Sequence, residues 1–195
     1  MLAIDPILPN ALMWRAMGKL DAGDLDGADH LMLRASDLGL AFAGLGISAV
    51  ADARGRNQEA AEALLPPLRA VTRDFPPGSA ELLVRGFYGD AEARAKALAV
   101  VDAYLTTRPA VVSGIAPYAL LRLGQLERGL ALFQAAPTKN DAMVFNLLWG
   151  PEGRAARALP AFGEFARKAG LADYWERHGA PDLCHRVAPR EYRCD

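Results

Sequence analysis

Glycine-led polar turns divide the first two thirds of the chain into segments whose apolar residues recur at helical spacing. The turns begin at positions 23, 55, 89 and 124, so the intervals are 32, 34 and 35 residues. Glycine adopts a positive φ without steric penalty and can end one helix, and a polar residue after it can cap the next. The pattern therefore predicts consecutive helix hairpins.

Each second helix carries a matching series of apolar positions. Five residues after three of the glycines stands a small residue (Ala28, Ala60 and Gly129), and nine residues after all four stands a larger apolar one (Met32, Leu64, Leu98 and Phe133). These positions share one helix face, so they are predicted to form the core. Arg94 stands where the third repeat should have its small residue.

The spacing and the small-then-large series resemble those of tetratricopeptide repeats over residues 9–137. The resemblance implies an all-α fold, an α–α superhelix in which four degenerate helix hairpins form a right-handed solenoid. The first helices depart from the family at Arg15 and Glu81, where a large apolar residue is usual. Pro66 and Pro67 are predicted to interrupt the second repeat and leave an extra short helix near 67–74, and Pro117 lies within another predicted helix.

Beyond Pro137 the period is lost, but helical patterns continue at 141–149, 159–169 and 171–178. Residues 138–179 are therefore predicted to add a helix pair and a capping helix, with Tyr174 and Trp175 covering the open end of the array. Residues 180–195 are predicted to be an irregular tail. Residues 1–195 are expected to form a single domain.

The segments Gly170–Trp175 and Gly179–Cys184 resemble the C-terminal end of some bacterial tetratricopeptide-like regions. Such regions are often attached to winged-helix transcription regulators or to adenylate-cyclase-type signalling proteins. This second resemblance implies a sensory or interaction domain of a regulatory protein.

In tetratricopeptide arrays the first helix of each hairpin lines a concave groove, which the resemblance assigns here to seven residues. They are Met13, Met17, Phe42, Asp52, Phe87, Tyr118 and Arg122. A groove of methionine and aromatic side chains with a few charges suits an amphipathic helix or an extended peptide. The alternative is that the apolar members belong to the core.

Composition supports the helical prediction and excludes some partners. Apolar residues make up 52% of the chain, Ala and Leu dominate, and the net charge is -1. Such a charge provides no broad field to attract nucleic acid. No apolar run reaches the roughly 18 residues of a membrane span, and the first ten residues lack the basic region of a signal peptide. These features leave the compartment open: the chain is expected to be cytoplasmic if it is the full-length protein, and periplasmic if it is an excised domain with its disulfide formed.

The two cysteines, Cys184 and Cys194, lie ten positions apart in the predicted tail. They either form a disulfide that closes a small loop or remain reduced thiols. With His178 and His185 they also make a set of zinc-ligand types, but the set lacks the close pairs of structural zinc sites, so no metal is expected.

No motif indicates catalysis. Residues 44–49 fit the letters of a dinucleotide fingerprint, but a helical pattern rather than a strand precedes them. His30 is isolated beside Asp29. We expect no enzymatic activity and no cofactor. The favoured function is a non-catalytic protein- or peptide-binding module, and the alternative is a scaffold that self-associates into a homo-oligomer.

Overall fold

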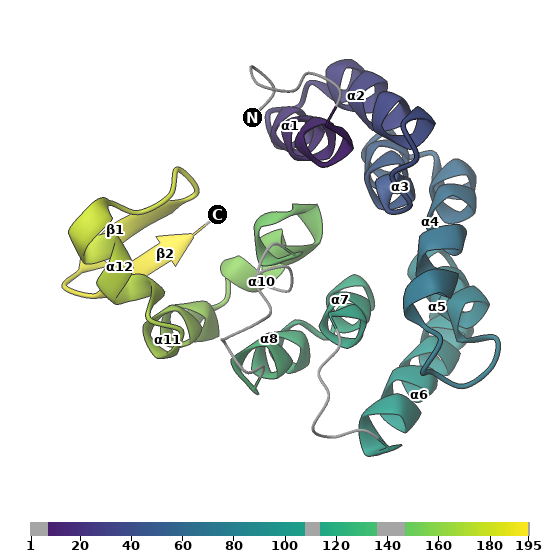
Figure 1. The fold of residues 1–195 in the computed structure, drawn as a ribbon. Helices are drawn as coiled ribbons and strands as arrows, with labels where there is room; N and C mark the ends of the chain where they lie inside the picture. Colours follow the sequence, from purple (N-terminus) through teal and green to yellow (C-terminus); the bar gives the residue numbers. More distant parts are fainter. Residues whose placement is uncertain (1–7, 108–113, 136–146, 195) are drawn as a thin grey trace. The chain divides into compact units, whose positions relative to one another are not determined.

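The computed structural model describes residues 8–107, 114–135 and 147–194, and the described chain is predominantly helical (Figure 1). The all-α prediction is confirmed, with one small two-stranded sheet near the C-terminus. The chain divides into two compact units, residues 1–100 and 101–195, and the division falls inside a helix.

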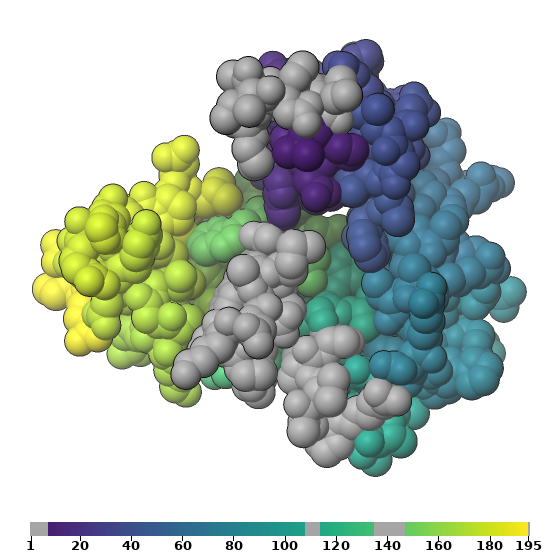
Figure 2. All heavy atoms as spheres, in the orientation of Figure 1, coloured from purple at the N-terminus to yellow at the C-terminus, as the bar shows by residue number. Residues whose placement is uncertain are grey.

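Unit 1 is a series of antiparallel helices, each packed against the next. The helices are α1 (Pro9–Asp21), α2 (Leu25–Asp37), α3 (Ala43–Ala53), α4 (Asn57–Val71), α5 (Ser79–Tyr88) and the first part of α6 (Ala91–Thr107). Contacts join α1 to α2, α2 to α3, α3 to α4 and α4 to α5, and α1 also contacts α3. The space-filling view shows α2, α3 and α4 in this sequential contact (Figure 2). Such packing is compatible with a helical-repeat solenoid.

The glycine turns follow the prediction at three of the four positions. Gly23, Gly55 and Gly124 have φ values of 78°, 71° and 77°. Gly89 instead has φ -100° and ψ -165°, which is extended backbone, so the predicted left-handed turn is wrong there. The second helices still begin two residues after each of these glycines.

In α2 and α4, the second helices of the first two hairpins, the buried residues match the predicted small-then-large series. Ala28, Met32, Ala60 and Leu64 are all fully buried. In α6 a different helix face is buried: Arg94 is exposed, whereas Ala97 is fully buried. The change accompanies the extended turn at Gly89, which lacks the left-handed residue of the other turns. The buried positions of α6 therefore begin at Ala97, later after the glycine than in α2 and α4.

The two prolines do not interrupt α4, so the predicted break and the short helix near 67–74 are wrong. Pro67 has no N–H to donate to the carbonyl of Ala63 four residues earlier. Gly44 of α3 lies directly against that carbonyl, since a Cβ on Gly44 would be 2.6 Å from the oxygen. Leu64 and Leu68 are both fully buried. Their burial holds α4 in place and outweighs the missing hydrogen bonds.

Gly18 occupies a helix position that an alanine could fill. An added Cβ there would meet no heavy atom within 4 Å. Glycine inside a helix costs about 0.5–1 kcal/mol relative to alanine, because it loses more backbone entropy on folding. Gly18→Ala is therefore expected to raise the free energy of unfolding by that amount, measured by urea denaturation. Gly23→Ala, placed at a positive φ, is the control and should lower it; equal effects would contradict the assignment.

Unit 2 contains one further hairpin, a set of short helices and the sheet. Its elements are the rest of α6, α7 (Ile115–Arg122), α8 (Leu126–Ala135), η1 (Pro151–Gly153), α10 (Arg154–Arg157), α11 (Pro160–Lys168), α12 (Leu171–His178), β1 (Cys184–Ala188) and β2 (Glu191–Cys194). Helices α7 and α8 pack together as the hairpin, and α8 also contacts α10 and α11. Pro117 is the third residue of α7, where an N–H would have no acceptor within the helix.

The predicted C-terminal helices agree with α11 and α12 to within one residue at each end. The predicted helix at 141–149 lies mostly outside the described residues, and residues 147–149 are helical. Trp175 is buried as predicted, at 5% exposure, whereas Tyr174 is 54% exposed and does not cover the core.

The prediction of an irregular tail is wrong, because the tail contains an antiparallel β-hairpin. Cys184 pairs with Cys194 across the strands, and their sulfur atoms form a disulfide. The register is irregular between Arg186 and Ala188, and Arg190 in the turn has φ 59°. Each strand is only four or five residues long, which is too short to give a clear alternating pattern in the sequence.

Candidate binding surface

The seven groove residues lie on first helices or immediately before them, in both units. Unit 1 holds Met13 and Met17 on α1, Phe42 before α3, Asp52 on α3 and Phe87 on α5, and unit 2 holds Tyr118 and Arg122 on α7. The candidate surface therefore has to be considered for each unit by itself.

In unit 1 the two methionines pack between α1 and α3. Met13 and Met17 contact the cluster around Leu12 and Met32, and Met17 also contacts a second cluster around Val50. Both methionines remain half-buried. They therefore contribute to the core and still present part of their side chains at the surface.

Two aromatic side chains, one on α1 and one just before α3, are much more exposed. Phe42, which caps the start of α3, is 41% exposed, and so is Trp14 of α1. Trp14 lies three residues before Met17, so the two share one side of α1. The sequence analysis missed Trp14; a tryptophan between two predicted groove methionines was the signal that could have found it.

The remaining predicted residues are less accessible. Asp52 and Phe87 are half-buried. Tyr118 is only 6% exposed, inside the core of unit 2. Arg122 lies 3.8 Å from Glu152, with the two side chains 13% and 12% exposed. Of the predicted apolar residues, only Phe42 is therefore exposed, while Met13, Met17 and Phe87 are half-buried.

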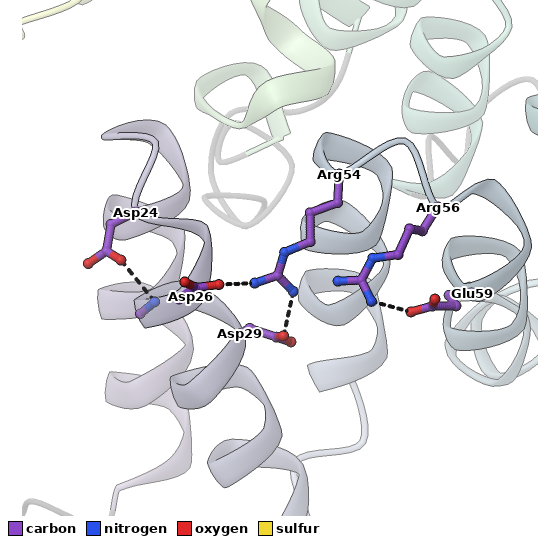
Figure 3. Close-up of polar contacts among 7 residues, drawn as sticks. Asp24, Asp26, Asp29, Arg54, Arg56 and Glu59 are labelled. Carbon is purple, nitrogen blue, oxygen red and sulfur yellow. Dashed lines mark hydrogen bonds and ion pairs between the residues drawn. The ribbon is translucent and has the colours of Figure 1, made fainter.

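The turn end of unit 1 carries a network of ion pairs (Figure 3). Arg54, at the end of α3, donates to Asp29 at 2.6 Å and also to Asp26, both on α2. The bonds to Asp29, and then to Asp26, raise the pKa of Arg54 above its ordinary value. Arg56 donates to Glu59 at 2.8 Å. The Arg54 bonds therefore link the end of α3 to α2, and the Arg56 pair lies within the start of α4.

The start of α2 is capped by the same kind of chemistry. The Asp24 carboxylate accepts the backbone N–H of Gly27 at 2.9 Å and also binds Lys19. The hydrogen bond from Lys19, and then that from Gly27, lower the pKa of Asp24. The acidic residues of the turn thus have structural contacts, as helix caps require.

In unit 2 one carboxylate of α12, that of Glu176, accepts three bonds from the hairpin. Oε1 of Glu176 accepts bonds from the backbone N–H of Arg190 at 2.9 Å, from Nε of Arg186 at 2.9 Å and from the hydroxyl of Tyr192 at 3.1 Å. These bonds, that of Arg190 first, hold the pKa of Glu176 below its usual 4.5. Burial, and then Glu176, raise the pKa of Tyr192.

This arrangement predicts that the hairpin is held less firmly in acid. Because the folded-state pKa of Glu176 is lowered, its contribution to stability is complete above about pH 4.5 and is lost as the pH falls through the folded-state value. Hydrogen exchange of the Arg190 amide, corrected for its intrinsic pH dependence, should show protection falling over that range.

Glu176→Gln should abolish most of this pH dependence. Glu164→Gln is the matched control. Glu164 forms a surface ion pair with Lys168, one turn along α11, and takes no part in the three bonds between Glu176 and the hairpin. A pH profile unchanged in Glu176→Gln would contradict the assignment.

Two open hollows lie at the starts of α4 and α6, and both are lined mainly by polar and charged side chains. Within residues 8–107, 114–135 and 147–194, no three His, Cys, Asp or Glu side chains gather as metal ligands. Within the same ranges, no helix has the length and apolar character needed to cross a membrane.

Comparison of the chain with models of protein families, with curated proteins and with solved structures gives no match.

Proposed function

We propose that the chain is a non-catalytic helical-repeat module that binds a protein or peptide through α1 and the start of α3. The observation that carries the proposal is the exposure of Trp14 on α1 and of Phe42 just before α3, each 41%. The half-buried Met13 and Met17 of α1 pack against the same core cluster as Ala43, the first residue of α3. Exposed aromatic side chains next to adaptable methionines are typical of surfaces that receive an amphipathic or extended peptide.

The repeats of this module are, in this proposal, degenerate tetratricopeptide repeats. The left-handed glycines at 23, 55 and 124 and the fully buried Ala28 and Ala60 support it, since they reproduce the turn and the close helix crossing of that family. The contact of α1 with α3 also supports it, because successive first helices must touch to form a shared surface. A sensory or interaction role in a bacterial regulatory protein follows from the resemblance of the tail and belongs to the same proposal.

The test selects peptides from a displayed library of random 16-residue sequences on the immobilised full chain. Selected peptides are then synthesised, labelled and titrated by fluorescence anisotropy. Truncating a central aromatic contact costs about 2 kcal/mol or more, which is roughly 30-fold in Kd. Trp14→Ala combined with Phe42→Ala is therefore expected to weaken binding at least that much.

Leu33→Ala is the matched control. Leu33 is 49% exposed on α2, a second helix, so its truncation removes a comparable apolar surface from the other side of the hairpin. It should change Kd less than twofold. Equal losses in both variants, or no peptide enriched above a blank support, would overturn the proposal.

Light scattering over a wide concentration range separates the self-association alternative. A constant monomer mass argues against a homo-oligomeric scaffold. If the chain forms a dimer that dissociates in the Trp14→Ala, Phe42→Ala variant, the partner bound at this surface is a second copy of the chain instead of a peptide.

A further inference from the structure

The β-hairpin forms the outermost layer of the core of unit 2. That core includes three aromatic side chains of α11 and α12 that are almost fully buried: Phe162 and Phe165, each 1% exposed, and Trp175, 5% exposed. Cys184, Tyr192 and Cys194 belong to the same core cluster. The atoms of the hairpin lie directly against those of α12 in the space-filling view (Figure 2, yellow on yellow-green).

The hairpin reaches this aromatic face through side chains of β2. The Tyr192 ring meets the Trp175 ring edge-on, with 5.0 Å between centroids. The backbone of Tyr192 lies close to Gly163 of α11, where a Cβ would come within 3.6 Å of the Tyr192 carbonyl oxygen. Removing the hairpin would therefore uncover the Trp175 ring of α12 and the surface of α11 around Gly163, in the core cluster that also holds Phe162 and Phe165.

Two further devices hold the hairpin closed. One is the set of polar contacts to α12, which comprises the three bonds to Glu176 and a 2.7 Å ion pair between Arg190 and Asp173. The other is the disulfide, which joins the strands at the end of the hairpin opposite its turn. An isolated two-stranded hairpin is marginally stable in water, so its order depends on such constraints.

We propose that the hairpin is a redox-controlled cover: the Cys184–Cys194 disulfide keeps it closed over the aromatic face of α11 and α12, and reduction by a dithiol lets it open. Cys184 and Cys194 are only 8% and 5% exposed, so attack of a reagent thiolate on their disulfide requires a brief opening of the strands. The polar contacts to α12 oppose that opening and make the closed, oxidised form persistent.

The dithiol itself supplies the two electrons and two protons that reduction of the disulfide requires. One of its thiolates attacks a protein sulfur, the S–S bond breaks and a mixed disulfide forms. The second reagent thiolate then attacks the reagent sulfur of the mixed disulfide and releases the protein sulfur that was attacked first. The protein gains two electrons and two protons as two thiols, and the reagent leaves as a cyclic disulfide.

Reduction removes the constraint on the loop between the cysteines. Closing a loop of about this length contributes enough in the chain-entropy account to change the ratio of closed to open hairpin by roughly 30- to 100-fold. The helices do not depend on that bond, so the response is expected to remain local to the tail.

Limited trypsin digestion of the full chain tests the cover. Arg186, Arg190 and Arg193 are exposed but held within or beside the strands, and Arg94 on α6 gives an internal control in unit 1. The protein is reduced with dithiothreitol, freed of reagent under argon and digested briefly beside an untreated sample. Mass spectrometry should show cleavage in the hairpin accelerated at least tenfold, with cleavage at Arg94 unchanged.

Binding of an anilinonaphthalene sulfonate dye should rise in parallel, because the aromatic face becomes accessible. The double variant Cys184→Ser, Cys194→Ser should show the cleavage rate and dye binding of the reduced protein both with and without dithiothreitol. It should also keep the helical circular dichroism. Unchanged hairpin cleavage after reduction would overturn the proposal. Cleavage accelerated equally at Arg94, or loss of the helical signal, would also overturn it, since the disulfide would then support the whole fold.

Discussion

Arg157→Ala is expected to lower the free energy of unfolding of unit 2 by about 3–5 kcal/mol, the largest effect of any single substitution considered. Arg157 is 4% exposed, and its Nη1 donates to the carbonyl oxygens of Leu148 and of Gly150, the latter at 3.3 Å. Its guanidinium also lies 5.8 Å from the centroid of the Trp149 ring.

Three losses add up in this variant. The carbonyls of Leu148 and Gly150 lose their donor in a buried place, and each such loss costs about 1–3 kcal/mol. The cation–π contact is lost as well, and the side chain leaves a cavity that the neighbouring helices fill only partly. Gly153 packs against the Leu148 carbonyl so closely that a Cβ there would be 2.3 Å away, which leaves little room for rearrangement.

Urea denaturation followed by circular dichroism measures the effect, with two comparisons. Arg157→Lys keeps the charge but loses the planar fork, so it should fall between the wild type and the alanine variant. Arg167→Ala removes an exposed arginine of α11 and should change the free energy of unfolding by less than about 0.5 kcal/mol. A loss below 1 kcal/mol in Arg157→Ala would show that other groups satisfy these carbonyls.

Gly44→Ala is expected to destabilise unit 1 by about 2–3 kcal/mol, although it adds a single methyl group. The added Cβ would lie 2.6 Å from the carbonyl oxygen of Ala63 and 3.2 Å from the ring of Pro67. The obstacle is backbone, and α4 is anchored on either side by the fully buried Leu64 and Leu68. Relief therefore requires the two helices to separate.

Gly46→Ala is the matched comparison on the same helix. An added Cβ there would meet the terminal Cε and Sδ of Met32, which belong to a flexible side chain that can change rotamer. Its cost should be smaller, about 1 kcal/mol. The two variants are compared by chemical denaturation, and equal losses would show that the identity of the neighbouring atom does not decide the outcome.

The elements that the sequence predicted well are those determined locally. A left-handed glycine acts within a few positions, and this explains why the starts of α2, α4 and α8 were predictable; at α2 the capping residue Asp24 acts just as locally. Gly89 shows the limit, since the same residue type in a similar setting adopts an extended conformation instead. The prolines of α4 show a second limit, because the contact that compensates for them comes from Gly44, on another helix.

The candidate surface was less predictable than the helices. Whether a residue such as Tyr118 is exposed or buried depends on which helices pack over it, and no local pattern carries that information. The tail illustrates the same point. Its strands are short, and their order depends on a carboxylate of α12 and on a disulfide.

The ion pairs from Arg54 to Asp26 and Asp29 cross from the first hairpin to the second, so they contribute to the interface between hairpins. A linear array unfolds in one step only while the coupling between neighbours is strong relative to the stability differences among them. These bonds lie at the surface, where salt weakens them. Ionic strength therefore acts on the cooperativity of unit 1: as it rises, α1 and α2 increasingly fray as a separate end of the array.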